Sequence, residues 1–215
     1  MSFDNLPGME KPVTILIVED SETAIAMIRH SIESAMNPVR LEFVRSLDEA
    51  RCWLDASLPD MAIVDLMLPD GKGTSLIYHD RDTAPFPVIV LTGAGNEVEA
   101  VEAIKHGALD YLVKTPEVLA DLPRVIERCL REWGHIVRHR LAENALRESE
   151  QRFRSIFFNA AAGMVVVTPQ RRITEVNPAF CSFTGFDAAE LHDRRIDELS
   201  HPEEAVRIAA MYDDL

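Results

Sequence analysis

The sequence predicts an α/β protein in which helices cover both faces of a five-stranded parallel sheet, followed by a long helix and a small α+β segment. Short apolar runs rich in branched aliphatic residues alternate with amphipathic segments up to residue 113, which is typical of βαβ units with buried strands. One uninterrupted helical pattern then follows. We therefore predict domains or segments at 12–121, 122–158 and 159–215.

The elements of the first domain follow in a regular order. The expected strands share short apolar runs and lie at 13–18, 41–45, 61–65, 87–91 and 109–113. The expected helices share apolar residues at helical spacing and lie at 22–36, 47–57, 72–82 and 96–107. Ser21 and Asn96 stand where helix N-caps are expected, and Gly107 stands at a helix end. Residues 69–71, Pro-Asp-Gly, predict a turn directly after the third strand.

The composition of the chain argues against several classes of protein. The chain has 22 basic and 36 acidic residues and a net charge of −14, which argues against a nucleic-acid-binding face. Its three cysteines, Cys52, Cys129 and Cys181, are odd in number and widely spaced, so a disulfide framework or zinc site is disfavoured and a reducing cytoplasm is expected. No apolar run approaches the roughly 18 residues of a membrane span and the N-terminus lacks signal-peptide features. We expect no membrane contact.

The long helix carries two series of apolar positions. They alternate steps of four and three residues, as in coiled coils, and lie at 126, 130, 133 and 137, then at 142, 146, 149 (a serine), 153 and 156. Five residues separate the two series, so the seam is offset near 138–141, as a stutter would do. The stripe either packs on its own domain or forms a homodimer interface that transmits twist or register, and we expect the homodimer.

The C-terminal segment changes pattern again. Residues 163–168 and 173–176 predict a β-hairpin. Short helices are expected at 177–184, 188–191 and 202–212. Two strands make no sheet of useful stability by themselves, so we expect this segment to be the first half of a domain that continues beyond residue 215.

Polar residues follow four strands of the predicted sheet. Asp65 closes the third run, Glu19 and Asp20 follow the first, Thr92 closes the fourth, and Lys114 follows the fifth. Each of these residue types also has an ordinary structural role, as a helix-initiating acid, a strand-end cap or a solvated charge. Together, however, they predict one site, because the carboxyl ends of parallel strands form the ligand-binding edge of open α/β sheets.

Phosphoryl chemistry fits this set of residues. A carboxylate can attack phosphorus and form an aspartyl phosphate, and Mg²⁺ can bridge two anions with an octahedron of oxygen ligands. The predicted ligands are carboxylates and one backbone carbonyl, from Glu19, Asp20, Asp65 and Met67. We expect Lys114 to neutralise charge on the incoming group and Thr92 to donate a hydrogen bond to it.

Five motifs in the first domain point to a known family. They read Ile-Val-Glu19-Asp20, Ile-Val-Asp65-Leu-Met-Leu-Pro-Asp-Gly, Val-Leu-Thr92-Gly-Ala, Gly107-Ala-Leu-Asp-Tyr111-Leu, and Lys114. With these motifs, residues 12–130 resemble a response-regulator receiver domain of two-component signalling. The resemblance implies a flavodoxin-like fold with strand order 2-1-3-4-5, and phosphoryl transfer to the chain from a sensor histidine kinase or phosphotransfer protein.

The resemblance also assigns roles to residues. It implies that Asp65 is the phosphoacceptor, that Glu19 and Asp20 hold magnesium, that Thr92 moves toward the phosphoryl group and Tyr111 follows it inward, and that Lys114 is the charged partner. The family usually has Pro directly after the Lys, joined by a cis bond, whereas here Thr115 follows and Pro116 comes next. A cis Lys114-Thr115 bond would cost about 3 kcal/mol, so we expect the loop to differ from the family's.

The segment from about residue 148 resembles the start of a PAS sensor domain. The matching motifs are Arg152-Phe-Arg-Ser-Ile-Phe-Phe-Asn-Ala-Ala, Asn177-Pro-Ala-Phe, Phe183-Thr-Gly-Phe and His201-Pro-Glu. PAS domains have a five-stranded sheet, and the later three strands are absent from the chain. Cys181 does not match the cysteine motif of flavin photosensors, so we interpret it as a small buried thiol.

The leading hypothesis is a phosphorylation-dependent signalling module that is not itself an enzyme, with the helix relaying its state to the PAS segment and an output beyond the chain. The alternative is the regulatory front end of an enzyme, such as a hybrid histidine kinase or a cyclic-dinucleotide synthase or hydrolase. An aspartate-nucleophile phosphatase is disfavoured, because Met67 stands where its second Asp is needed. A receiver-like domain that only binds partners is a third possibility. The kinase, the stimulus and the output stay open.

Overall fold

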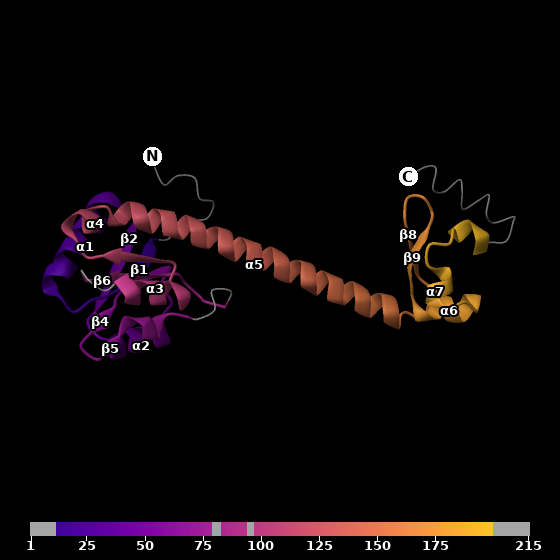
Figure 1. The fold of residues 1–215 in the computed structure, drawn as a ribbon, viewed down its shortest axis with the longest axis horizontal. Helices are drawn as coiled ribbons and strands as arrows, with labels where there is room; N and C mark the ends of the chain where they lie inside the picture. The colour runs from indigo at the N-terminus through magenta and orange to yellow at the C-terminus, as the bar shows by residue number, and fades with distance from the viewer. Residues whose placement is uncertain (1–11, 79–82, 94–96, 200–215) are drawn as a thin grey trace. The chain divides into compact units, whose positions relative to one another are not determined.

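The structure is a computed structural model that describes residues 12–78, 83–93 and 97–199, without the side chains of 97–100 (Figure 1). The chain divides into two compact units, one up to Leu141 and one from Ala142.

The first unit is built on a five-stranded sheet. Its strands are β1 (Val13–Val18), β2 (Val39–Val44), β3 (Met61–Asp65), β6 (Val88–Thr92) and β7 (Asp110–Val113). They are all parallel, in the order β2-β1-β3-β6-β7. The predicted fold class and the order 2-1-3-4-5 of the five main strands are therefore confirmed. Strand β2 begins two residues before the predicted position 41.

Helices cover both faces of this sheet because successive strand residues point to opposite sides. On one face, Ile15 and Ile17 pack in a core with Ile28 of α1 and Ile126 of α5. On the other, Leu16 and Val18 pack in a core with Leu47 of α2 and Ala103 of α3. The helices are α1 (Glu22–Ala35), α2 (Leu47–Ala56), α3 (Glu97–Lys105), α4 (Pro116–Ala120) and α5 (Leu122–Asn159).

Two of the three residues predicted at helix ends lie within the described ranges. The Ser21 hydroxyl accepts a hydrogen bond from the Ala24 N–H and caps α1, as expected. Gly107 has φ of +108°, and the Ala108 N–H donates to the Ala103 carbonyl across it. Such a left-handed residue closes a helix C-terminus, which is why glycine suits the position. Asn96 lies outside the described residues.

The predicted helix at 72–82 is wrong over the part that the structure describes. In its place are two short antiparallel strands, β4 (Met67–Leu68) and β5 (Gly71–Lys72), and the 3₁₀ helix η1 (Gly73–Leu76). The cause is tertiary: the chain turns back onto the end of β3, and a Cβ on Gly73 would lie 2.0 Å from the Asp65 carbonyl oxygen. Residues 79–82 lie outside the described ranges.

Helix α5 matches the predicted helix 122–158 to within a residue at its end. Its first apolar series belongs to the core of the first unit, where Ile126 is 0% and Trp133 9% exposed. The predicted homodimer interface is therefore wrong for this half of the helix, because these residues pack against the chain's own sheet. The second series is open to solvent, with Leu146 61% and Ile156 59% exposed.

The second unit contains the predicted hairpin and short helices. They are β8 (Val165–Val167), β9 (Ile173–Val176), α6 (Pro178–Thr184), α7 (Ala188–Leu191) and the 3₁₀ helix η2 (Ile196–Leu199). Strands β8 and β9 are antiparallel, and a small core forms around Ile173, Val176 and Leu191. The helix predicted at 202–212 lies outside the described residues.

A single buried amide joins the parts of this unit. The Asn177 side chain is fully buried. Its Oδ1 accepts from the backbone N–H groups of Met164 and Phe180, and its Nδ2 donates to the carbonyls of Phe157 and Ala162. The amide therefore uses both donors and both acceptor positions, and it fixes the end of α5 to the hairpin and to α6.

Candidate functional site

Acidic side chains gather at the carboxyl edge of the sheet. Glu19 and Asp20 follow β1 and Asp65 ends β3, and these strands are direct neighbours. One oxygen from each of the three carboxylates lies within 4.8 Å of the others. Glu19 and Asp65 are buried, whereas Asp20 is exposed. The parallel order of the strands is what brings together acids that stand far apart in the sequence.

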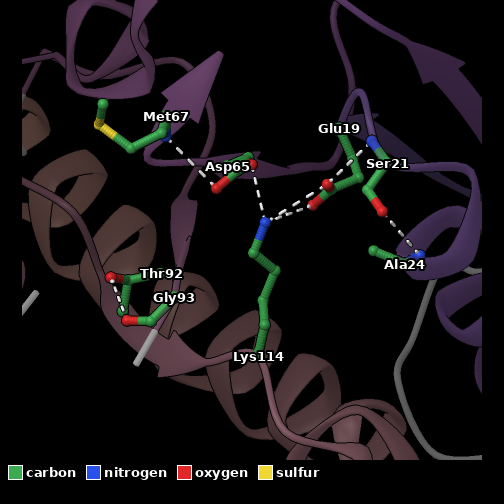
Figure 2. Close-up of polar contacts among 8 residues, drawn as sticks. All are labelled: Glu19, Ser21, Ala24, Asp65, Met67, Thr92, Gly93 and Lys114. Atoms are coloured by element: carbon green, nitrogen blue, oxygen red, sulfur yellow. Dashed lines mark hydrogen bonds and ion pairs between the residues drawn. The ribbon is translucent and has the colours of Figure 1, made fainter. Parts of the chain in front are cut away.

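Lys114 reaches into this cluster from the end of β7. Its Nζ lies 2.7 Å from Asp65 Oδ2 and 3.2 and 3.3 Å from the two Glu19 carboxylate oxygens, as Figure 2 shows. The Lys114–Thr115 bond is trans. Thr115 instead caps α4, because its hydroxyl accepts from the Val118 N–H, and Pro116 is the first residue of that helix. The missing family proline therefore does not keep Lys114 from the site.

The charges of the cluster are strongly coupled. Burial and then the neighbouring Asp65 charge raise the pKa of Glu19, while Lys114 opposes them. Burial would lower the pKa of Lys114, but its hydrogen bond to Asp65 and the Glu19 charge outweigh it, and the pKa is raised. Lys114 is therefore a cation held between two anions. Three carboxylates facing one ammonium still leave an excess of negative charge, which favours a further cation.

The donor set fits Mg²⁺. This ion takes oxygen ligands, with one or two carboxylates from protein in most sites, and the cluster offers carboxylate oxygens alone. Glu19, Asp20 and Asp65 would hold the ion here. The Met67 N–H donates to Asp65 Oδ1 at 3.4 Å, so the backbone of Met67 lies beside the acceptor. Its carbonyl stays a predicted ligand.

The two proposed switch residues lie apart from the acids. Thr92 is buried at the end of β6, and its hydroxyl donates to the Gly93 carbonyl at 3.2 Å, away from Asp65 and Lys114 (Figure 2). Tyr111 lies on β7 and is 39% exposed. The structure thus brings Glu19, Asp65 and Lys114 into contact, with Asp20 beside them. Thr92 and Tyr111 do not join these contacts, and their roles stay predictions.

Two residues that the sequence did not assign to the site also shape it, Gly73 from the predicted helix 72–82 and Asp70 from the predicted turn 69–71. Gly73 lets the chain pass close to the Asp65 carbonyl. Asp70 accepts hydrogen bonds from the backbone N–H groups of Leu47 and Asp48. No local pattern announces the second contact, because 23 residues separate Asp70 from Leu47. An acid at the tip of the turn was the available signal, and it is too common to identify the partner.

Comparisons with known proteins bear directly on this arrangement. The family profile of the response regulator receiver domain matches residues 15–126. The chain belongs to the response regulator receiver domain family. A PAS domain profile matches residues 151–212. The first unit is therefore a receiver domain of two-component signalling, and a PAS segment follows it.

Individual relatives are similar to different shares of the chain. The methanogenesis regulatory protein FilR1 of Methanothrix harundinacea is 34% identical over 58% of this chain and 29% of its own length. The phosphate regulon regulatory protein PhoB of Rhizobium meliloti is 35% identical over 55% of this chain and 54% of its own. The sensor histidine kinase TmoS of Ectopseudomonas mendocina is 28% identical over 90% of this chain and 22% of its own. The chain thus spans between about a fifth and about half of these relatives.

Solved structures show the same fold. The signal receiver domain of an HD domain-containing protein from Pseudomonas fluorescens has a TM-score of 0.53 and 24% identity, covering 63% of this chain and 98% of that one. A CheY-like receiver domain protein from Methanospirillum hungatei has a TM-score of 0.50 and 24% identity, covering 58% and 98%. Within the described ranges, no helix combines the length and apolar character that crossing a membrane requires.

Proposed function

We propose that the chain accepts a phosphoryl group on Asp65, in a Mg²⁺-dependent reaction, from a partner histidine kinase or phosphotransfer protein. The observation that carries the proposal is the cluster of three carboxylates with one ammonium, centred on Asp65 at the carboxyl edge of a receiver sheet. The membership of the receiver family supports the same assignment.

In the proposed step, an Asp65 carboxylate oxygen attacks the phosphorus of a phosphohistidine. The bond between phosphorus and the imidazole nitrogen breaks, and its electron pair stays on the donor histidine. Lys114 already contacts Asp65 Oδ2, so its ammonium orients the carboxylate and then neutralises charge on the arriving group. Bound Mg²⁺ would supply the positive charge that lets two anions approach each other.

The proposed switch uses Thr92 and Tyr111. Thr92 leaves the Gly93 carbonyl, to which it donates in this structure, and binds a phosphoryl oxygen on Asp65. The ring of Tyr111, now 39% exposed, moves into the space that opens. The surface made by α3, β7 and α4 changes shape as a result, which is how a local charge event acquires a distant effect.

The proposed relay runs from the receiver (12–121) through the helix (122–158) to the PAS segment (159–215) and an output beyond it. Homodimerisation through the exposed apolar residues of α5 is part of this proposal, as is a cytoplasmic location, which the three unpaired cysteines support. The alternative is the front end of an enzyme. The similarity to a sensor histidine kinase over 90% of the chain supports that alternative, and reading the gene past the codon for Leu215 would test it.

Intact mass after treatment with acetyl phosphate tests the acceptor. We expect one phosphoryl increment on the wild-type chain with Mg²⁺, none after chelation of Mg²⁺, and none on Asp65→Asn. Asp60→Asn is the matched control, because Asp60 is an acid at the other end of the sheet, where it accepts from the Thr14 N–H. An unlabelled wild-type chain would support a domain that only binds partners, and labelled Asp65→Asn would place the acceptor elsewhere.

A further inference from the structure

Asp70 binds the start of a helix that is distant in sequence. It stands in the turn between β4 and β5, just after the proposed acceptor. Its Oδ1 accepts from the Leu47 N–H at 2.9 Å and its Oδ2 from the Asp48 N–H at 3.0 Å. These are the first two residues of α2, and the first N–H groups of a helix have no partner within it. The Ser46 hydroxyl accepts from the third N–H, that of Glu49. Asp70 therefore completes the capping of α2.

The charge of Asp70 strengthens this contact. The hydrogen bond from Leu47, with further help from that of Asp48 and from the Arg51 charge, holds the pKa of the carboxyl below its usual value. A carboxylate at a helix N-terminus is also favoured by the helix dipole. Asp70 is therefore ionised at neutral pH, and the turn stays attached to α2.

The other end of the same hairpin contacts the acceptor. The Met67 N–H donates to Asp65 Oδ1 at 3.4 Å, and the Gly73 N–H donates to the Leu66 carbonyl at 3.0 Å. Met67 pairs with Lys72 within the hairpin, whose tip is only the two residues that join the strands. Leu68 is buried in the core beside α2. Such a short, paired hairpin has little freedom, so a displacement at its tip moves the Met67 backbone.

We propose that Asp70 is a positioning residue for the metal and acceptor site. By fixing the β4–β5 hairpin to the N-terminus of α2, it sets where the backbone of Met67 stands relative to the Asp65 carboxylate. The inference rests on the proposed function, since it concerns the proposed magnesium ligands. Asp70 would thus act on the site only through the backbone of Met67, without binding the metal ion or the phosphoryl group itself.

Calorimetric titration of the purified full chain with Mg²⁺ alone tests the proposal. We expect Asp70→Ala to weaken Mg²⁺ binding about tenfold, the lower range for residues that orient metal ligands. Asp70→Asn keeps one acceptor oxygen and loses the charge, so its affinity for Mg²⁺ should lie between those of the wild type and Asp70→Ala. It also serves if the alanine variant does not fold.

Two matched controls separate positioning from general effects. Asp60→Ala removes an acid that accepts a backbone N–H at the opposite end of the sheet, and should lower stability without changing the Mg²⁺ affinity. Asp48→Ala removes a charge next to Asp70 while its own N–H remains, and controls for long-range electrostatics. An Asp70→Ala affinity equal to that of either control would overturn the proposal and leave Asp70 as a structural cap.

The wild-type chain separates this inference from the function on which it rests. If the wild type binds Mg²⁺ and takes the phosphoryl label, but Asp70→Ala binds Mg²⁺ equally well, only the positioning role is wrong. If the wild type neither binds Mg²⁺ nor takes the label, the proposed function fails and the inference fails with it.

Discussion

The two halves of α5 have the same spacing of apolar residues but different surroundings. Ile126 and Trp133 in the first half are buried against the chain's own sheet and helices, whereas Leu146 and Ile156 in the second half are mostly exposed. The spacing therefore establishes that each half has an apolar face. What covers that face depends on elements far away in the sequence, and the spacing says nothing about them.

The apolar residues change from buried to exposed at the point where the two series are offset. Arg140 donates to the Ala84 carbonyl at 3.3 Å and lies over the Trp133 ring, whereas the next residue, Leu141, is 62% exposed. The five-residue step from Val137 to Ala142 turns the apolar face by roughly 140° around a helix of 3.6 residues per turn. The two series are thus on different sides of the helix, and a single seam with a stutter does not describe them.

The largest effect is expected from a substitution that removes buried side-chain contacts in the first half of α5. Ile126→Ala should lower the free energy of unfolding of the first unit by about 3 kcal/mol, because it leaves a cavity in the core. Leu146→Ala is the matched control and should change it by no more than about 0.5 kcal/mol. Urea unfolding at a concentration where light scattering shows a monomer measures both. Equal losses in the two variants would remove the distinction between the halves.

The second largest effect is expected in the reactivity of cysteine thiols in the two halves of α5. Burial raises the pKa of the Cys129 thiol to about 11, so little thiolate forms at pH 8 and alkylation should be on the order of a hundredfold slower than for an ordinary exposed cysteine. A cysteine introduced by Leu146→Cys should react rapidly. Peptide mapping after timed alkylation gives the rates, with exposed Cys52 as the internal reference. Rapid native-state labelling of Cys129 would contradict the buried position of the first half.

The third prediction concerns association of the second half. Leu146→Asp combined with Ile156→Asp should weaken the proposed homodimer roughly tenfold or more, since an apolar interface cannot accommodate unpaired charges. Asn144→Asp combined with Ser155→Asp adds the same charge on the other side of the helix and should leave association unchanged. Sedimentation over a concentration series measures it. A wild-type chain that stays monomeric at high concentration would count against the dimer itself.

The smallest expected effect comes from an exposed ion pair at the base of α5. Arg128 pairs with Asp110 at the start of β7, and its side chain is 58% exposed. Because solvent screens such pairs, Arg128→Ala should lower the free energy of unfolding by between zero and about 1 kcal/mol. Thermal unfolding of this variant beside Ile126→Ala shows whether packing or charge attaches α5 to the sheet. A loss as large as that of Ile126→Ala would favour charge.

Sequence patterns predicted most of the fold because they are local. Runs such as 61–64 and 88–91 are apolar throughout, and a strand buried on both faces needs that composition. Where the prediction was wrong, at 72–82, Gly73 allows a close approach to the Asp65 carbonyl that only the folded sheet creates. The gathering of Glu19, Asp20 and Asp65 was predictable for a related reason, since residues that end parallel strands meet at one edge.

By itself, the sequence determined the α/β class, the carboxyl-edge placement of the acids and the extent of the long helix, because alternation and periodicity report which faces must be buried. Tertiary structure alone decided that Lys114 bridges Glu19 and Asp65, that Asp70 caps α2, and which half of α5 belongs to the receiver core. These contacts join residues distant along the chain. Their geometry follows from the packing of whole elements, which no local pattern specifies.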